Sequence, residues 1–142
     1  MMPIALYVHI PFCAKKCAYC DFRSWAGREA DWGRYLNALE EEFKTSAARY
    51  GKLPVATAFI GGGTPSILPE DAVMRILAMT RARFELLPGA EVTVEANPGT
   101  LSPEKLRAWR DSGVNRLSVG LQAAQPAIIE MLGRIHTAEE AR

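Results

Sequence analysis

The chain has 142 residues, of which 49% are hydrophobic and 23% charged, and its formal net charge at pH 7 is +1. This balance predicts one globular domain with a hydrophobic core and excludes an intrinsically disordered chain. A near-neutral charge without a basic block gives no electrostatic basis for binding nucleic acid. No apolar stretch has the length of a transmembrane segment, and no secretory signal is recognised. Free cysteines without an export signal predict a reducing, cytoplasmic location.

Apolar segments rich in β-branched residues alternate with segments whose apolar residues follow a helical period. The first helix is predicted between Trp32 and Tyr50, and the second from about Pro69 through Thr80. The sequence Ser102-Pro103-Glu104 predicts the start of a third helix, because serine caps helices and proline suits their first turn. Residues Ala127–Leu132 are the fourth candidate. The predicted strands are Ile4–Ile10, Val55–Ile60, Glu91–Glu95 and Arg116–Leu121.

This alternation of strands and helices predicts an α/β fold with a parallel sheet and helices packed on it. The pattern alone does not decide between an open sheet and a barrel. In both architectures the chemistry gathers at the carboxyl ends of the strands. Unusual residues lie at the ends of all four predicted strands, which predicts a single site on one rim. They are the cysteine run, Gly61–Pro65, Glu95–Pro98 and Gln122.

The three cysteines of the chain, Cys13, Cys17 and Cys20, lie in one short run after the first predicted strand. An odd number of cysteines packed this tightly does not make a disulfide framework. The C-x3-C-x2-C spacing places three thiolates around one centre, one fewer than an iron–sulfur cubane or a structural zinc site takes. An iron without a protein ligand is free to bind another molecule. We therefore favour a cubane cluster with one open iron.

Two other interpretations of the cysteines stay open on spacing alone. A histidine, either His9 or His136, would complete a zinc site, although zinc sites usually contain two paired ligand motifs and this chain has no second pair. In the other interpretation the thiols are surface cysteines that hold no metal.

The glycine run Gly61–Pro65 matches neither the P-loop nor the G-x-G-x-x-G pattern, so a nucleotide phosphate is not predicted there. Glycine leaves the backbone open to a ligand, which suits a small zwitterion beside the cysteines. The alternative is an ordinary flexible turn. Glu95 is either a solvated carboxylate or an acceptor for an ammonium group or for ribose hydroxyls.

Several segments together resemble the radical S-adenosylmethionine superfamily and, more narrowly, the oxygen-independent coproporphyrinogen III oxidase family. The resemblance covers essentially the whole chain. It implies a partial TIM-type barrel of parallel βα units, of which this chain contains the first four or so. The segments that carry the resemblance are Tyr7-Val-His-Ile-Pro-Phe-Cys13, the cysteine spacing with Tyr19 before Cys20, Gly61–Pro65, Glu95-Ala-Asn-Pro, Ser118–Gln122 and Leu132–His136.

The resemblance also implies a role for each matching residue. Cys13, Cys17 and Cys20 would hold three irons of a [4Fe-4S] cluster, and S-adenosylmethionine would chelate the fourth. Such a site, once reduced by a donor such as a flavodoxin or ferredoxin, produces a 5′-deoxyadenosyl radical that abstracts hydrogen from a substrate. The implied cofactor contacts are Gly62, Gly63 and Thr64 for the methionyl part, Glu95 and Gln122 for polar groups, Arg134 for the carboxylate or ribose, and Tyr7 and Tyr19 beside the site.

The oxidases of this family carry a further cysteine two residues past the third, where this chain has Phe22. They also have an extension ahead of the cysteine loop, which this chain is expected to lack. Both departures favour a sister branch whose members resemble haem chaperones, which bind haem and deliver it to respiratory proteins. Two function classes therefore stay open, a haem chaperone and a radical enzyme that decarboxylates coproporphyrinogen III or a related tetrapyrrole.

Residues 1–142 are expected to form the N-terminal portion of a radical S-adenosylmethionine core domain. The rest of the barrel and a C-terminal domain are expected to lie outside this sequence. Four βα units would leave an unpaired apolar strand edge, which natural proteins cover. His9 and His136 suit axial ligation of haem by their chemistry, but the sequence assigns neither of them to that role.

Overall fold

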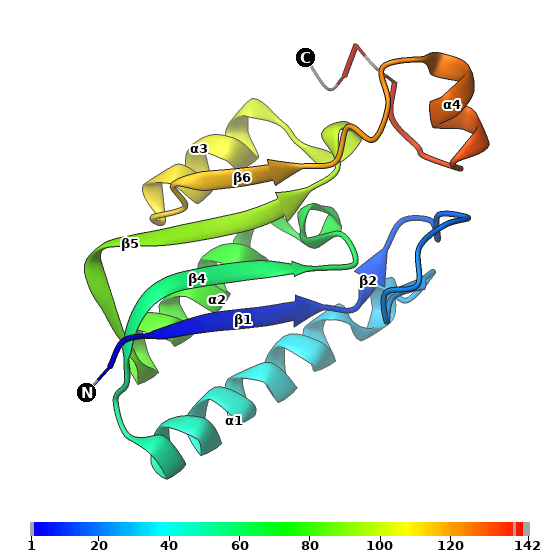
Figure 1. Cartoon of the computed structure of the whole chain (residues 1–142). Helices are drawn as coiled ribbons and strands as arrows, with labels where there is room; N and C mark the ends of the chain where they lie inside the picture. Colours follow the sequence, from blue (N-terminus) through cyan, green and yellow to red (C-terminus); the bar gives the residue numbers. More distant parts are fainter. Residues whose placement is uncertain (1, 138, 141–142) are drawn as a thin grey trace.

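A parallel four-stranded sheet forms the centre of the computed structural model, which describes residues 2–137 and 139–140. The strand order is β1-β4-β5-β6, every neighbouring pair is parallel, and all four arrows point toward the same rim (Figure 1). Because strands that follow one another along the chain lie side by side, this is the arrangement of a barrel segment and not of a doubly wound sheet. The strands are β1 (Ile4–Ile10), β4 (Pro54–Gly62), β5 (Glu85–Ala96) and β6 (Arg116–Val119).

Of the four α-helices in the described part of the chain, three cover one face of this sheet and the last lies near the rim (Figure 1). Leu39 and Ile76 share a single buried core with Ile60 and Val94 of the central strands. Trp109 is 1% exposed and completes this core from α3. Each such side chain stabilises the fold by about 1.5–3 kcal/mol on burial. The helices are α1 (Trp32–Tyr50), α2 (Glu70–Arg83), α3 (Pro103–Asp111) and α4 (Pro126–Met131).

The structure confirms the predicted order of strands and helices and differs at some boundaries. β1 has the predicted bounds, and Ser102 caps α3, since its Oγ accepts a hydrogen bond from the Lys105 N–H at 3.1 Å. The second strand is longer than predicted, because Gly61 and Gly62 still pair with β1 and belong to β4. The fourth strand ends earlier, at Val119, and Leu121 lies beyond it.

The third strand, β5, begins six residues before the predicted Glu91, at Glu85. Its pairing with β4 is irregular, since Val55 lies opposite Leu86 while Thr57 lies opposite Glu91. The residues skipped in this register contain Pro88, which has no N–H to donate to a ladder. They also contain Gly89 with φ of 77°, a conformation that favours glycine. The irregular segment hid the first half of the strand from the apolar pattern.

Short elements that the sequence pattern did not predict connect the strands to the helices at the rim. The strand pair β2 (Phe12–Cys13) and β3 (Trp25–Ala26) brackets the other two cysteines and is joined by the backbone. Two-residue strands and single helical turns have no sequence period, so no periodic signal was available for them. The single-turn 3₁₀ helices are η1 (Glu29–Asp31), η2 (Pro65–Ile67) and η3 (Pro98–Thr100).

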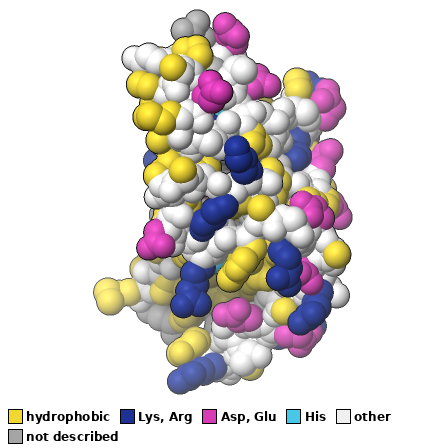
Figure 2. All heavy atoms as spheres, turned by 90° about the vertical axis from the view of Figure 1, so that its right-hand side faces the viewer, with side chains coloured by type: hydrophobic (Ala, Val, Ile, Leu, Met, Phe, Trp, Pro, Cys, Tyr) yellow, Lys and Arg dark blue, Asp and Glu magenta, His cyan; other side chains and the backbone are white. Residues whose placement is uncertain are grey.

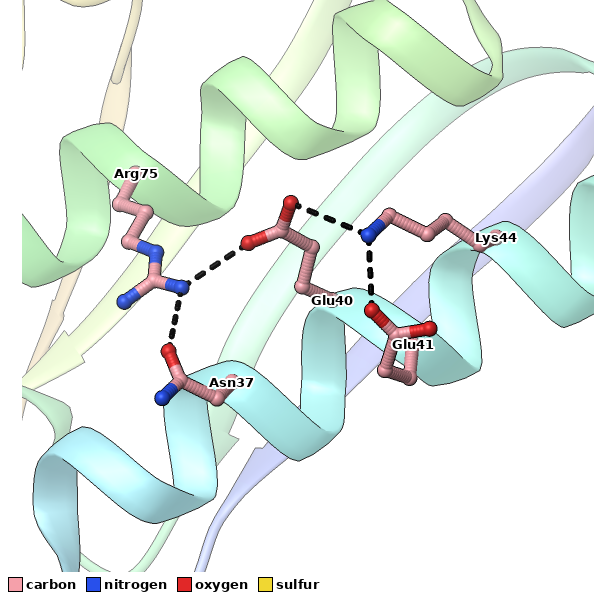
Figure 3. A network of polar contacts seen from close by, with 5 residues as sticks. All are labelled: Asn37, Glu40, Glu41, Lys44 and Arg75. Carbon is pink, nitrogen blue, oxygen red and sulfur yellow. Dashed lines mark hydrogen bonds and ion pairs between the residues drawn. The ribbon is translucent and has the colours of Figure 1, made fainter.

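A polar network joins α1 to α2 on the outer surface (Figure 3). Arg75 Nη2 donates to Glu40 Oε2 at 2.9 Å and to Asn37 Oδ1 at 2.8 Å. Lys44 Nζ lies 3.6 Å from Glu40 Oε1 and 2.7 Å from Glu41 Oε1. The hydrogen bond from Arg75 lowers the pKa of Glu40 below its ordinary value. Because the network is exposed, it adds little to the stability of the fold.

The sheet face opposite α1–α3 carries polar and aromatic side chains. Tyr7, Phe59, Thr93 and Arg116 lie side by side across the four strands of this face. Arg116 Nη1 also lies 3.2 Å from Glu91 Oε1 of β5. This row would line the interior of a barrel. In the described part of the chain, no helix is both long and apolar enough to cross a bilayer.

Candidate functional site

The three cysteines lie on a loop that is tied back to the end of β1. Cys13 is buried in β2, whereas Cys17 and Cys20 are partly exposed, and all three thiols are free. The Cys20 N–H donates to the Cys17 carbonyl at 3.1 Å and closes a turn between them. The Trp25 N–H donates to the Pro11 carbonyl at 2.9 Å, which closes the base of the loop. These two hydrogen bonds fold the loop so that all three cysteines line one pocket at the rim.

Lys16 holds this loop from within. Its Nζ donates to Ser24 Oγ at 3.2 Å and to the Phe22 carbonyl. The lysine thus satisfies acceptors on the returning half of the loop, and its side chain also lines the pocket described below. The role of Lys16 was not predicted from the sequence, because a short pair of lysines in a loop carries no local signal.

The glycine run at the end of β4 lies directly against the β1–β2 connection. The Gly63 N–H donates to the Ile10 carbonyl at 2.7 Å, and the Thr64 N–H donates to the Phe12 carbonyl at 2.7 Å. A Cβ on Gly63 would lie 2.4 Å from the Phe12 carbonyl oxygen, and one on Gly62 would lie 2.6 Å from the His9 ring. Gly62 also has φ of 111°. Gly63 is therefore required by the close approach of the Phe12 backbone, and Gly62 by its positive φ and the adjacent His9 ring, which excludes an ordinary flexible turn.

His9 and Tyr35 support this connection from opposite sides. The two ring nitrogens of His9 are both engaged, Nδ1 with Tyr7 Oη at 3.1 Å and Nε2 with the Arg23 carbonyl at 2.8 Å. Tyr35 Oη donates to the His9 carbonyl, and burial raises the pKa of Tyr35 to about 12. Burial, with a smaller effect of the Glu95 carboxylate, also raises the pKa of Tyr7. His9 is therefore a structural link between β1 and the cysteine loop.

Arg134, which follows α4, reaches back to the rim. Its Nη2 donates to the Gly120 carbonyl at 2.8 Å and its Nη1 to Cys17 Sγ at 3.6 Å. Its Nε is buried and has no hydrogen-bond partner among the described residues. Burial raises the pKa of Tyr19, and the nearby Arg134 guanidinium partly opposes this shift. Gln122 has φ of 67°, so the chain turns sharply after β6.

One pocket of about 330 Å³ gathers almost all the predicted site residues on this rim. Figure 2 looks onto the rim, where basic side chains lie across the middle of the face between apolar ones. Tyr7 is the only predicted site residue that does not line the pocket; it bonds to His9, whose ring lies against Gly62. The predicted residues that line it are Cys13, Cys17, Cys20, Tyr19, Gly62, Gly63, Thr64, Glu95, Gln122 and Arg134.

Neither histidine supports the zinc interpretation. His9 has both ring nitrogens engaged, and His136 is 3% exposed with its Nε2 against the Leu121 carbonyl at 3.2 Å. Over residues 2–137 and 139–140, no three His, Cys, Asp or Glu side chains converge enough to hold one metal ion. A cubane has a different requirement, because its thiolates bind different irons and stand apart around the cluster. The three free thiols of Cys13, Cys17 and Cys20 line one pocket, and this arrangement fits a [4Fe-4S] cluster.

Asn97 was not predicted as a site residue, and the structure places it in the lining of the pocket. It is 7% exposed, and its N–H donates to Ser66 Oγ at 3.0 Å. Its side-chain Oδ1 is buried without a partner among the described residues. A buried acceptor beside a pocket is a candidate contact for a ligand donor. The only sequence signal for this residue was its place just after a strand end.

The family model of the radical SAM superfamily matches residues 7–142, and the chain belongs to this superfamily. The chain is 42% identical over 141 residues to "Heme chaperone HemW" of Escherichia coli (strain K12), an alignment that covers 99% of this chain and 37% of that protein. It is 40% identical over 137 residues to "Radical S-adenosyl methionine domain-containing protein 1, mitochondrial" of Mus musculus, covering 96% of this chain and 31% of that protein.

Among solved structures, the chain is similar to coproporphyrinogen III oxidase (HemN) from Escherichia coli, described as a radical SAM enzyme. The TM-score is 0.90 at 32% sequence identity, and the match covers 97% of this chain and 32% of that chain. The prediction of a parallel, partial barrel of the radical SAM type is thereby confirmed. The chain spans about a third of the length of the proteins it matches.

Proposed function

We propose that this chain holds a [4Fe-4S] cluster through Cys13, Cys17 and Cys20 and binds S-adenosylmethionine beside it. The observation that carries the proposal is the convergence of three free thiols and a glycine-lined backbone on one rim pocket. When bound and reduced, the pair of cofactors supplies one-electron cleavage of a sulfonium and hence radical chemistry. The low-potential reductant is a one-electron donor such as a flavodoxin or ferredoxin.

The pocket offers groups that complement a small zwitterion. Gly62 and Gly63 line the pocket with main-chain atoms only, and their missing side chains let β4 pack against the β1–β2 connection. The buried, unpartnered Nε of Arg134 is a cationic donor suited to a carboxylate. Glu95 faces the same pocket and suits an ammonium group or ribose hydroxyls. The presence of both a carboxylate and a guanidinium in the lining of one pocket supports binding of an amino acid moiety.

For the whole protein we propose a haem chaperone that binds haem and passes it to a receiving protein. The proposal is supported by similarity to proteins named heme chaperone over nearly the whole chain. Phe22, which is 61% exposed and lines the pocket, stands where the oxidases carry a further cysteine. His9 and His136 are engaged or buried, so we do not propose either as a haem ligand. We propose that the haem contacts lie in the part of the protein beyond this sequence.

The alternative is a radical oxidoreductase that decarboxylates coproporphyrinogen III or a related tetrapyrrole. It is supported by the structural similarity to coproporphyrinogen III oxidase. Both proposals require a tetrapyrrole ligand and the same cofactors, so they differ in what happens to that ligand.

We further propose that residues 1–142 are the N-terminal portion of the radical SAM core domain of a longer protein. The lengths of its relatives support this assignment. Three free cysteines, which suit a reducing compartment, support a cytoplasmic location.

The test uses the full-length protein after anaerobic reconstitution with iron and sulfide. S-adenosylmethionine should alter the electron paramagnetic resonance spectrum of the reduced cluster, because it occupies the open iron. Haem binding and 5′-deoxyadenosine release are then measured on the same sample. Haem binding without conversion of coproporphyrinogen III supports the chaperone, and conversion supports the oxidoreductase. A reduced cluster whose spectrum ignores S-adenosylmethionine would contradict the shared site.

A further inference from the structure

The segment that follows α4 is attached to the cysteine loop at two points. Arg134 Nη1 donates to Cys17 Sγ at 3.6 Å across 117 positions of sequence. The Ala18 N–H donates to the Leu132 carbonyl at 3.4 Å beside it. A main-chain contact and a side-chain contact to adjacent residues of the loop fix the guanidinium relative to the Cys17 sulfur.

The guanidinium is also held from its other side. Its Nη2 donates to the Gly120 carbonyl at 2.8 Å. A Cβ on Gly120 would lie 2.8 Å from this nitrogen, so the missing side chain at Gly120 makes room for the arginine. No carboxylate of residues 2–137 and 139–140 forms an ion pair with Arg134. The permanent charge of the guanidinium therefore acts on the sulfur without a carboxylate in direct ion-pair contact to offset it.

We propose that Arg134 is a positioning residue that raises the reduction potential of the cluster through its contact with Cys17, in addition to binding S-adenosylmethionine. The inference rests on the proposed cluster. Reduction adds one electron, taken from a one-electron donor, to a centre whose thiolate ligands are already negative. A cationic N–H donor at one ligand sulfur stabilises the more negative, reduced form more than the oxidised form. Hydrogen bonds to cluster sulfurs are among the features that set such potentials.

The test is a potentiometric titration of the full-length protein without S-adenosylmethionine, followed by electron paramagnetic resonance of the reduced cluster. At a fixed applied potential, R134Q should lower the ratio of reduced to oxidised cluster about tenfold, which for a one-electron couple equals a 59 mV drop in midpoint potential. R134K keeps the charge without the planar fork and should show a smaller drop. The matched control is R116Q, which should leave the potential unchanged, because Arg116 of β6 pairs with Glu91 of β5 and does not line the pocket.

A purely structural role for Arg134 would change how much cluster is loaded but not the potential of the loaded fraction. An unchanged potential in loaded R134Q would overturn the inference and leave the proposed cluster standing. A wild-type protein that loads no iron would instead contradict the proposed function. If R134Q loads no cluster, the wild-type protein and R134K are instead both labelled with ¹⁵N-arginine. The electron spin of the reduced wild-type cluster should then couple to the ¹⁵N of Arg134, and R134K should lose this coupling. The absence of this coupling in wild-type protein would overturn the inference.

Discussion

The carboxylate of Glu95 accepts a hydrogen bond from the backbone N–H of Gly62 at 2.8 Å. This bond joins the ends of β4 and β5 at the rim, between residues 33 positions apart in the sequence. A Cβ on the neighbouring Gly61 would lie 2.7 Å from the same carboxylate, so that glycine leaves room for it. One oxygen of Glu95 thus shapes the glycine run, while the side chain also faces the pocket.

We expect substitutions of Glu95 to separate these two roles. Glu95→Ala leaves the Gly62 N–H without an acceptor and should lower the free energy of unfolding by about 1–3 kcal/mol. Glu95→Gln keeps an oxygen acceptor and should stay close to wild type in stability. If the charge contacts the ammonium group of S-adenosylmethionine, Glu95→Gln should still weaken binding about tenfold, or 1.4 kcal/mol. Urea unfolding measures the change in stability, and calorimetry measures the binding of S-adenosylmethionine. Equal binding by Glu95→Gln and wild type would contradict a contact between the Glu95 carboxylate and the ammonium group.

The glycine run predicts a sharp contrast between two alanine substitutions. Gly63→Ala places a Cβ 2.4 Å from the Phe12 carbonyl oxygen, a backbone atom that cannot move without the cysteine loop. We expect a loss of about 1–3 kcal/mol in unfolding free energy, as for other overpacked sites. Gly99→Ala is the control, because its Cβ would meet His136 at an ordinary 3.6 Å. Its effect should stay within about 0.5 kcal/mol. Equal unfolding midpoints for the two variants would contradict the close packing of Gly63.

The cysteines should act as a set. Replacing any one of Cys13, Cys17 or Cys20 by alanine should abolish stable cluster binding, because two thiolates cannot hold the three irons that need a protein ligand. Ala18→Ser is the matched control in the same exposed loop, since its backbone bond to Leu132 is kept. Iron and sulfide analysis after anaerobic reconstitution gives the result. Stoichiometric zinc with no iron in the wild-type protein would restore the zinc interpretation.

The regular parts of the fold were predictable because their residues repeat with the period of the element. β1 alternates toward the core at Val8 and Ile10, and α1 buries Leu36, Leu39 and Phe43 at helical steps. Cys13, Glu95 and Gln122 could be assigned to one rim because parallel strands end at the same edge of a sheet. The sequence position of a strand end was therefore enough to place a side chain.

Other features depend on contacts that have no local pattern. Pro88 and Gly89 interrupt the apolar signal of β5, so half of that strand was missed. The contact between Arg134 and Cys17 joins distant segments through one side chain, and no periodicity reports such a contact. The structural role of His9 depends on a carbonyl group of the loop, and carbonyl positions are set only after the chain has folded.

Tyr35 gives the fold a pH dependence at high pH. Burial raises its pKa from 10.0 to about 12, so the folded state holds the phenolic proton more tightly than the unfolded state. This contribution to stability is fully present below pH 10 and is lost as the pH rises from 10 to about 12. Tyr35→Phe also loses the hydrogen bond to the His9 carbonyl and should be less stable at neutral pH by about 1 kcal/mol.

The difference in unfolding free energy between wild type and Tyr35→Phe should therefore shrink as the pH rises above 10. Titration of the phenolate absorbance gives an independent measurement, because the variant should lack the step near pH 12. Tyr50→Phe is the control, since Tyr50 is 55% exposed. A Tyr35 that ionises together with the exposed tyrosines would contradict its burial against the loop.

Phe22 separates the two tetrapyrrole proposals. It is 61% exposed and lines the pocket, so a substitution there should change the rim without disturbing the core. The full-length wild-type protein should bind haem and should not convert coproporphyrinogen III, because an aromatic ring cannot do the chemistry of the thiol that the family resemblance implies for the oxidases at this position. Phe22→Cys alone should not create oxidase activity, since one thiol leaves the shape of the rest of the pocket unchanged.

Phe22→Ser, which removes the ring without adding a thiol, is the control, and product analysis under anaerobic reducing conditions is the measurement. Decarboxylation by the wild-type protein would contradict the chaperone and support the radical oxidoreductase, while conversion by Phe22→Cys but not by Phe22→Ser would show that this thiol was the missing part of an oxidase site.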